Sequence, residues 1–422
     1  MSTTALKNGS VIASMLTQYA SGINKNKNWE GDKILVVGSI FSNRGDQAMT
    51  FTAVDQLSRR FPEKDCVLFT IKPEQIHNPS EYEFEVVSLD ATYRARSLNT
   101  LGKFSGVFGP PLFKKFDQIW KDAAFAVDIN GYALSSQTGV EDTLGYLLTL
   151  MTADEYEVPY YILPQSIGPF NYRPIEHVFL DPLLRRYIEI PELIFPREDH
   201  GVEALRRYTN RHIEQSSDIV LQHGEYDLNN IFVDPPKIDV PQFENPTVGI
   251  VPNARVASRV DEQELIEMYK SIGEVINGLD YQLTIFAHTT SDRKLCELIH
   301  DAIGFGELLD TPYNAIELEH IINQLDFIIG SRYHSIIHAY KCGVPAVVIG
   351  WAVKYKELLR RFDQLEYHFD CRFGLAEKEI VDAVNELSLN SDKEETVIKN
   401  TLDEVRAESV FDRIKTNIES NQ

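Results

Sequence analysis

The stretch FIIGSRYHSIIHAYKCGVPAVVIG, residues 327–350, decides the fold prediction. Two short apolar runs, 327–329 and 346–349, flank a segment with the spacing of a helix. A strand, a helix and a second strand in this order form the βαβ unit of a parallel sheet. Gly343, followed by Val-Pro, is expected to end the helix before the second strand begins. The stretch therefore predicts an α/β protein with an open parallel sheet.

Four residues lie where the first strand gives way to the helix: Ser331, Arg332, Tyr333 and His334. Ser331 is expected to cap the helix, which places Arg332 and His334 in its first turn. The free N–H groups of a helix N-terminus favour an anion by about 0.3–1 kcal/mol, whereas a hydrogen bond to a charged partner contributes about 1.5–3 kcal/mol. We therefore expect Arg332 to dominate the binding of an anionic ligand.

The same cluster is compatible with a surface arginine beside a packed histidine, and with a metal site at His334 and His338, one helical turn apart. The metal site lacks the glutamate that follows the first histidine in H-E-x-x-H, so none is predicted. A basic residue in the first turn opposes the helix dipole, which favours a functional reason for its presence.

The chain is strongly acidic, because its 422 residues carry 63 Asp and Glu against 41 Lys and Arg, a net charge of −22. Such a field repels a phosphate backbone, which argues against nucleic acid as a partner. An anionic small substrate requires a locally basic site. The length is sufficient for two domains with separate cores.

The first 31 residues lack the continuous apolar core of a secretory signal, and no run in the chain approaches the roughly 20 apolar residues of a transmembrane helix. The four cysteines are widely separated, as is typical of reduced thiols in a cytosolic protein. We expect a cytoplasmic protein, either free or at the inner membrane surface.

Alternating strand-like and helical segments divide the chain into two halves. Strands are expected at 33–41, 66–71, 124–131, 159–168 and 193–199, and after the proline-bearing segment 225–246 again at 247–253 and 281–289. The predicted organisation is an N-terminal arm at 1–30, a Rossmann-like domain at 31–224, a linker at 225–246, a second Rossmann-like domain at 247–375 and C-terminal helices at 376–422. Ligands bind beyond the carboxyl ends of such strands, so we expect the site in a cleft between the two domains.

Candidate site residues follow the expected strands. The segment GSIFSNRGDQA, residues 38–48, matches neither G-x-G-x-x-G nor a P-loop, and its Asn43 and Asp46 either shape a turn and helix cap or face the site. Further post-strand candidates are Asp128, Asn130, Gln165, Ser166, Arg197, His288 and Lys354. Arg197 is equally compatible with an ion pair to its neighbours Glu198 and Asp199. Each of these post-strand loops, taken alone, is also compatible with a plain turn.

Three motifs resemble those of the polysaccharide pyruvyl transferase family. They are N-x-G-D-x-A at 43–48, Q-S-I-G-P at 165–169, and R-x-H followed by G-V-P at 332–345. FPRED at 195–199 resembles the family's serine-arginine-acid motif, with Pro196 in place of the serine. The resemblance covers about residues 33–360. Asp128-Ile129-Asn130-Gly131 stands where the family has a glycine run, so the acceptor is not indicated.

The resemblance implies a fold like that of B-type glycosyltransferases (GT-B), with the acceptor on the first domain and the donor on the second. It implies phosphoenolpyruvate as co-substrate, no cofactor, and a saccharide or carrier-linked saccharide as acceptor in polysaccharide or exopolysaccharide biosynthesis. The pyruvyl group would bridge two sugar hydroxyls as a ketal. A requirement for a divalent ion is not determined.

The chemistry implied by this resemblance suggests a role for each candidate. His334, titrating near neutrality, would protonate the methylene carbon of the donor, and Asp46 or Asp128 would accept the proton of a sugar hydroxyl. The donor would be bound by Arg332, Arg197, Ser331, Tyr333, Lys354 and His288, and the acceptor-side loops would contribute Asn43, Asn130, Gln165 and Ser166. Two alternatives are a glycosyltransferase that uses a nucleotide sugar and a non-catalytic sugar- or anion-binding protein.

Overall fold

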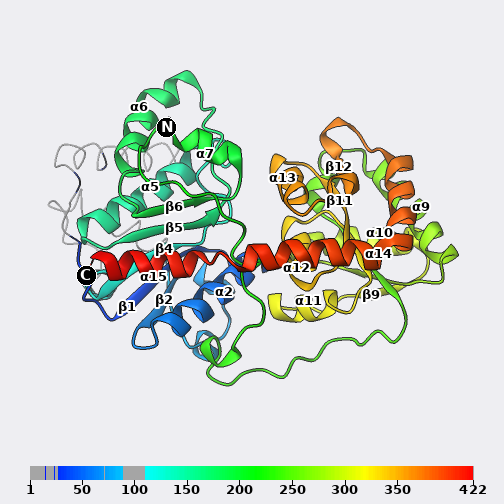
Figure 1. Cartoon of the computed structure of the whole chain (residues 1–422), viewed down its shortest axis with the longest axis horizontal. Helices are drawn as coiled ribbons and strands as arrows, with labels where there is room; N and C mark the ends of the chain where they lie inside the picture. The colour runs from blue at the N-terminus through cyan, green and yellow to red at the C-terminus, as the bar shows by residue number, and fades with distance from the viewer. Residues whose placement is uncertain (1–14, 16–22, 24–26, 71, 89–109, 422) are drawn as a thin grey trace.

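The computed structural model describes residues 15, 23, 27–70, 72–88 and 110–421, so most of the predicted N-terminal arm, 1–30, lies outside the described residues. Two parallel six-stranded sheets with helices packed around them form the molecule (Figure 1), which confirms the predicted α/β fold with two Rossmann-like domains. No helix within the described ranges has the length and apolar character needed to cross a bilayer.

The first sheet has the strand order β3-β2-β1-β4-β5-β6. Its strands are β1 (Lys33–Ser39), β2 (Asp65–Thr70), β3 (Glu85–Ser88), β4 (Ala123–Asp128), β5 (Tyr160–Gln165) and β6 (Leu193–Pro196). The helices around it are α2 (Arg44–Arg60), α4 (Pro110–Lys121), α5 (Val140–Glu155), α6 (Pro174–Tyr187) and α7 (Asp199–Leu205). The central strands β1 and β4 are buried almost throughout, because helices cover both faces of a parallel sheet.

The second sheet has the order β12-β11-β10-β7-β8-β9. Its strands are β7 (Thr247–Val251), β8 (Gln282–Phe286), β9 (Glu307–Leu309), β10 (Phe327–Gly330), β11 (Ala346–Gly350) and β12 (His368–Asp370). The helices around it are α8 (Ala254–Ala257), α9 (Glu262–Gly278), α10 (Arg293–Ile303), α11 (Ala315–Ile322), α12 (Tyr333–Cys342), α13 (Val353–Arg361) and α14 (Glu377–Arg406). The opening stretch of sequence forms β10, α12 and β11, as predicted.

One detail of α12 differs from the prediction. Arg332, with an extended backbone, occupies the N-cap position, and no side chain caps the helix. The Ser331 hydroxyl instead lies 3.1 Å from the hydroxyl of Tyr269 on α9, in the interior of the domain. Gly343 ends the helix with φ +81°, a conformation that suits glycine.

The end of the chain returns to the first domain. Helix α14 packs beside the second sheet, whereas α15 (Val410–Asn421) lies beside the first (Figure 1). Arg60 of α2 pairs with Asp412, at 2.8 Å, and the Tyr161 hydroxyl donates to Asn417. Helix α15 also packs an apolar face against the rest of the protein, since Val410, Phe411, Ile414 and Ile418 are buried.

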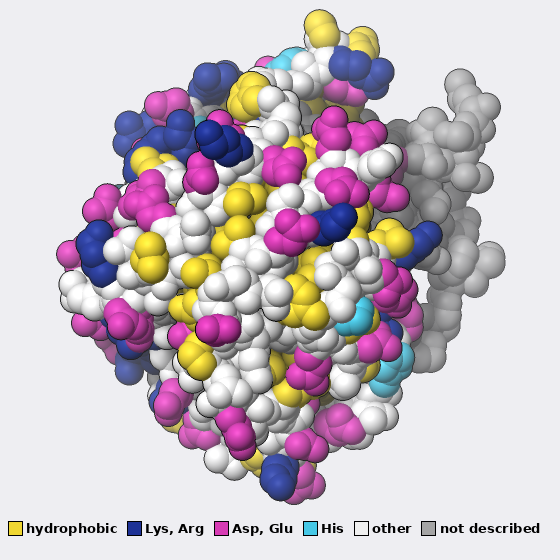
Figure 2. All heavy atoms as spheres, turned by 90° about the vertical axis from the view of Figure 1, so that its right-hand side faces the viewer, with side chains coloured by type: hydrophobic (Ala, Val, Ile, Leu, Met, Phe, Trp, Pro, Cys, Tyr) yellow, Lys and Arg dark blue, Asp and Glu magenta, His cyan; other side chains and the backbone are white. Residues whose placement is uncertain are grey.

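Acidic side chains are spread over the outer face of the second domain, whereas Lys and Arg side chains gather toward its upper edge (Figure 2). This distribution agrees with the net charge of −22. Any concentration of positive charge inside the molecule therefore calls for a specific explanation.

Candidate active site

A cavity of about 530 Å³ lies between the two domains, beyond the carboxyl ends of their strands. Residues of both sheets line it, as expected for two Rossmann-like domains that share a site. Nine of the predicted site residues line this cavity: Asn43, Asp46, Asn130, Arg197, His288, Arg332, Tyr333, His334 and Lys354.

His334 reaches from the second domain to the first. A Cβ atom on Gly45, at the start of α2, would lie 2.1 Å from His334 Nδ1, so the imidazole occupies the space that the glycine leaves open. His334 Nε2 is buried without a hydrogen-bond partner and lies 3.7 Å from Oδ2 of Asp218. Burial, and then the positive charges of Arg197 and Lys354, lower the pKa of His334 well below its ordinary value. The prediction that this histidine titrates near neutrality is therefore wrong for the ligand-free protein.

Asp46 lies on the other side of the same point. A Cβ atom on Gly131 would be 3.7 Å from Asp46 Oδ1 and 4.0 Å from His334 Cε1, so the two side chains converge above this glycine. Burial raises the pKa of Asp46 to about 7. A carboxyl group that titrates near neutrality can exchange protons with a substrate in either direction.

Lys354 carries one of the cavity's unbalanced positive charges. Its ammonium lies 4.5 Å from the ring centre of Tyr333 and 5.6 Å from that of Tyr132, and no carboxylate within the described part of the chain pairs with it. Burial and the nearby Arg197 lower the pKa of Lys354 to about 8. The side chain is therefore largely charged at neutral pH and available to an anion.

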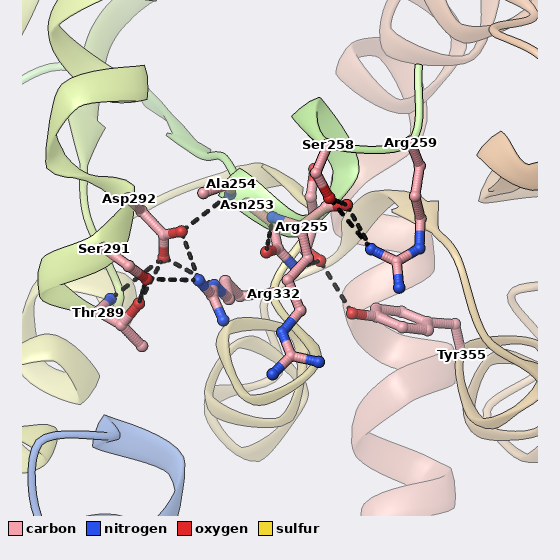
Figure 3. A network of polar contacts seen from close by, with 11 residues as sticks. Asn253, Ala254, Arg255, Ser258, Arg259, Thr289, Ser291, Asp292, Arg332 and Tyr355 are labelled. Carbon is pink, nitrogen blue, oxygen red and sulfur yellow. Dashed lines mark hydrogen bonds and ion pairs between the residues drawn. The ribbon is translucent and has the colours of Figure 1, made fainter. Parts of the chain in front are cut away.

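Arg332 is held by a carboxylate of its own domain (Figure 3). Its Nε and Nη2 donate to the two oxygens of Asp292 at 2.7 and 2.5 Å, and Nη2 also donates to Ser291 at 3.0 Å. Because the buried Asp292 balances the guanidinium charge, the structure does not support the expectation that Arg332 dominates anion binding. Asp292 also accepts from the backbone N–H of Ala254, so the pair positions α8.

Arg197 is likewise balanced, although not by the acidic neighbours considered from the sequence. Its Nη1 donates to Asp218, which lies 21 residues further along the chain. Its Nη2 donates to the Gly131 carbonyl at 2.5 Å and to the Ser166 hydroxyl at 3.1 Å. Arg197 thus holds the loop at Gly131 through this hydrogen bond. Its guanidinium carbon also lies 5.2 Å from the ring centre of Tyr333.

Four predicted site residues do not line the cavity: Asp128, Gln165, Ser166 and Ser331. The Asp128 carboxylate is buried and accepts hydrogen bonds from Asn130, Tyr160 and Gln165, which leaves it unsuited to accept a substrate proton. Its role is to fix Asn130, which does line the cavity. Gln165 and Ser166 belong to the layer beneath, since Ser166 donates to Glu198 at 2.7 Å.

Four charged residues at the site were not predicted from the sequence: Arg255, Asp218, Glu141 and Asp142. Arg255 follows β7 and lines the cavity. Its guanidinium extends away from α8 (Figure 3), and no carboxylate among the described residues pairs with it. The post-strand rule that identified Lys354 would also have identified Arg255. Asp218 follows no strand, and only the fold brings it beneath Arg197 and His334.

Arg255 and Lys354 lie on the two sides of the α12 N-terminus. The strand before α12, β10, lies between β7 and β11, which lead to Arg255 and Lys354 respectively. Two unbalanced cations thus flank a helix end whose free N–H groups also favour anions. On the opposite wall, α5 of the first domain contributes Glu141 and Asp142. The cavity is therefore cationic on the second domain and partly acidic on the first.

Within the described ranges, no group of three or more His, Cys, Asp or Glu side chains is arranged to hold a metal ion. His338, considered from the sequence as a metal ligand with His334, is fully buried, and its ring centre lies 5.3 Å from that of His288. The two histidines of α12 do not face one common site.

Solved structures support the fold. The UDP-GlcNAc 2-epimerase of Methanocaldococcus jannaschii superposes with a TM-score of 0.55 at 10% identity, over 85% of this chain and 93% of that chain. Staphylococcus aureus MnaA, solved with UDP, gives 0.52 at 12% identity over 87% and 90%, and the glycotransferase of kitacinnamycin gives 0.51 at 12% identity over 93% and 99%. At these identities the likeness shows a GT-B-like fold alone.

No curated protein matches the sequence. The family model of polysaccharide pyruvyl transferases matches residues 43–352, a range that contains the Asn43 turn, Arg197, His334 and most of both sheets. The chain belongs to the polysaccharide pyruvyl transferase family, a family of enzymes.

Proposed function

We propose that the protein transfers the pyruvyl unit of phosphoenolpyruvate to two hydroxyls of a saccharide and forms a pyruvate ketal. The observation that carries this proposal is the meeting of His334 and Asp46, from different domains, beside two unbalanced cations and a helix N-terminus. Phosphoenolpyruvate bears a phosphate and a carboxylate on one small molecule. Lys354 and Arg255, on either side of α12, match two anionic groups a short distance apart.

The reaction requires a proton at the methylene carbon of the donor, after which the neighbouring carbon accepts a hydroxyl oxygen. In the proposal, His334 supplies this proton. A bound dianionic phosphate adds negative charge beside the imidazole, which opposes the effect of Arg197 and Lys354 and raises the histidine's pKa. Binding of the donor would thereby favour the protonated form of His334 that the reaction needs.

Asp46, whose pKa is about 7, would accept the proton of the attacking sugar hydroxyl. The second hydroxyl then displaces phosphate and closes the ketal. The two sugar hydroxyls release two protons. One restores the proton that His334 gave to the new methyl group, and the other leaves with phosphate, so the reaction is balanced in protons. The aromatic and acidic wall of Tyr132, Tyr146 and Glu141 would receive the sugar.

Phosphate release from phosphoenolpyruvate in the presence of a panel of saccharides and carrier-linked saccharides tests the proposal. The expected result is saccharide-dependent phosphate release that is lost in His334→Ala, together with a product carrying a methyl ketal signal in NMR. Release of a nucleoside diphosphate from a nucleotide sugar, without phosphate release from phosphoenolpyruvate, would instead identify a glycosyltransferase. Binding of saccharide or anion without either reaction would indicate a binding protein.

A further inference from the structure

Asp218 is a buried carboxylate that has no role in the proposed reaction as described. It lies in the irregular segment that follows α7, and only 2% of its surface is exposed. Its Oδ1 accepts from the backbone N–H of Val220 at 3.0 Å, which fixes the orientation of the carboxylate. Its Oδ2 is left to face the site.

Two groups face that one oxygen. Arg197 Nη1 donates to Oδ2, and His334 Nε2 lies 3.7 Å from it. The distance to His334 is about 0.5 Å longer than a hydrogen bond. His334 Nε2 is buried and has no hydrogen-bond partner, and the Asp218 carboxylate is an acceptor that a small movement would bring within hydrogen-bonding distance of it.

We propose that Asp218 is the positioning residue for His334: it accepts a hydrogen bond from Nε2–H, directs Nδ1 toward the donor and stabilises the imidazolium that protonates it. This inference rests on the proposed function. The two sides of the ring divide accordingly, since Nε2 faces Asp218 whereas Nδ1 and Cε1 face Gly45 and Gly131. A carboxylate that orients a histidine through its inner nitrogen is a common arrangement in acid–base catalysis.

The charged and titratable groups around His334 explain why such a carboxylate is needed. Positive charge comes from Arg197, just after β6, and from Lys354 of α13. Two buried imidazoles are added by His288, in the loop after β8, and by His338 of α12 itself. Asp46 of α2 lies near the same point, since a Cβ atom on Gly131 would be 3.7 Å from its Oδ1 and 4.0 Å from His334 Cε1. Asp218 places a negative charge beside these two cations before the donor binds, and Glu198 also acts on both.

The proton transfer balances through the two ring nitrogens. The Nδ1–H bond breaks as the C3–H bond of the donor forms, and the ring returns to its neutral form with the remaining proton on Nε2, donated to Asp218. The next proton reaches Nδ1 from the sugar hydroxyl by way of Asp46. No proton is transferred to Asp218 in these steps.

The principal test is Asp218→Asn, which preserves the size of the side chain. We expect kcat to fall roughly a hundredfold while the KM for phosphoenolpyruvate changes little. Carboxylates that orient a metal-ligating histidine contribute about 10–100-fold, and we expect an effect of similar size from a carboxylate that orients an acid–base histidine. We also expect the alkaline limb of the kcat–pH profile to move to lower pH, because an amide stabilises the imidazolium less than a carboxylate does. Asp199→Asn, an exposed acid near Arg197, is the matched control and should leave both unchanged.

A second measurement uses the wild-type protein, in case Asp218→Asn does not fold beside the buried Arg197. Nitrogen-15 NMR of the histidine rings, assigned with His334→Gln, reports which nitrogen carries the proton. In the free protein we expect the neutral ring to carry its proton on Nε2. When inorganic phosphate is added, the second nitrogen should become protonated at a higher pH than it does in the free protein. An Nδ1–H form, or an unchanged pH profile in a folded Asp218→Asn, overturns the inference. The NMR measurement does not use phosphoenolpyruvate. It can therefore show whether Asp218 orients His334 even if phosphoenolpyruvate proves not to be the donor.

Discussion

Among the individual residues of the site, Lys354 is the group on which we expect binding of the proposed donor to depend most. It is a cation that faces the cavity without a carboxylate partner among the described residues, whereas Arg332 and Arg197 are each balanced by a buried aspartate. A hydrogen bond to a charged group contributes about 1.5–3 kcal/mol, and each 1.4 kcal/mol is a factor of about ten in affinity. Lys354→Ala should therefore weaken the binding of phosphoenolpyruvate at least tenfold in isothermal titration. Lys356→Ala, an exposed lysine on the same helix, should not.

Donor affinity should also depend on pH with a definite sign. The pKa of Lys354 is lowered to about 8, so its charge is present below pH 8 and is lost as the pH rises through that value. The dissociation constant of phosphoenolpyruvate should increase roughly tenfold between pH 7 and pH 9. Lys354→Arg, whose guanidinium stays charged, should remove this dependence. An equal pH dependence in that variant would show that another group is responsible.

Gly45 is predicted to control the position of His334. A Cβ atom there would lie 2.1 Å from the imidazole Nδ1, so Gly45→Ala must displace the ring by more than about 1 Å to restore a normal contact. Misplacement of a catalytic group by about 1 Å lowers rates by roughly a hundredfold. We expect such a fall in kcat for phosphate release, with the fold retained. Gly278→Ala at the end of α9, where a Cβ meets no atom within 4 Å, is the control.

Among the helices and strands, the ion pair between Arg332 and Asp292 joins three segments of the second domain. Asp292 lies at the start of α10, accepts from Ala254 of α8 and pairs with the N-cap residue of α12 (Figure 3). Removal of one partner of a buried pair leaves the other charge uncompensated, at a cost of about 3–5 kcal/mol. Asp292→Ala should lower the free energy of unfolding in urea by that amount.

Two further variants test the structural role of this pair. Asp310→Ala removes a surface pair with Arg293, in which the aspartate is 70% exposed, and should cost less than about 1 kcal/mol. Arg332→Ala should weaken phosphoenolpyruvate binding less than Lys354→Ala does. The opposite order would restore Arg332 as the main anion ligand, in agreement with the sequence-based prediction.

Most of the strands that the sequence predicted lie inside the sheets, and β6, an edge strand, was predicted as well because all four of its residues are buried. β1, β4, β7, β10 and β11 occupy central places in the sheets, and their continuous apolar runs reveal them. β3, β9 and β12 were not predicted, because all three are short edge strands, EVVS, ELL and HFD, and lie only partly buried. An edge strand has one strand neighbour and partial cover, so its side chains need not be apolar.

The candidate site was predictable to the same extent. The rule that functional residues follow strands located His334, Lys354 and Asp46, because it depends on the fold class alone. It could not show which charges are balanced, because the partners lie 40 residues away from Arg332 and 21 residues away from Arg197. Those pairs determine which cation is available to a ligand, and only the folded chain brings them together.

In the molecule as a whole, the two domains are joined along one side and open along the other. A single apolar cluster contains Phe51 of α2 and Ile316 of α11, so the core continues from one domain into the next. The cavity lies on the side where the cationic wall of one domain faces the partly acidic wall of the other. His334 crosses between them, so the site is complete only when both domains are held in this arrangement.

The C-terminal helix α15 contributes to that arrangement, since it extends from the second domain and packs on the first. Phe411 is its fully buried anchor, with the Arg60 guanidinium 5.7 Å from its ring centre and the ring of His223 5.4 Å away. Truncation of a buried phenylalanine to alanine costs about 3–5 kcal/mol. Phe411→Ala should therefore reduce the free energy of unfolding by this amount. It should also lower kcat at temperatures where the wild-type protein is stable, because loosening α15 loosens the contact between His334 and Gly45.

Phe373→Ala, which removes a ring that is 87% exposed, should change neither stability nor rate appreciably. If Phe411→Ala unfolds earlier in urea yet keeps full activity below its transition, α15 stabilises the first domain without holding the two halves of the site together.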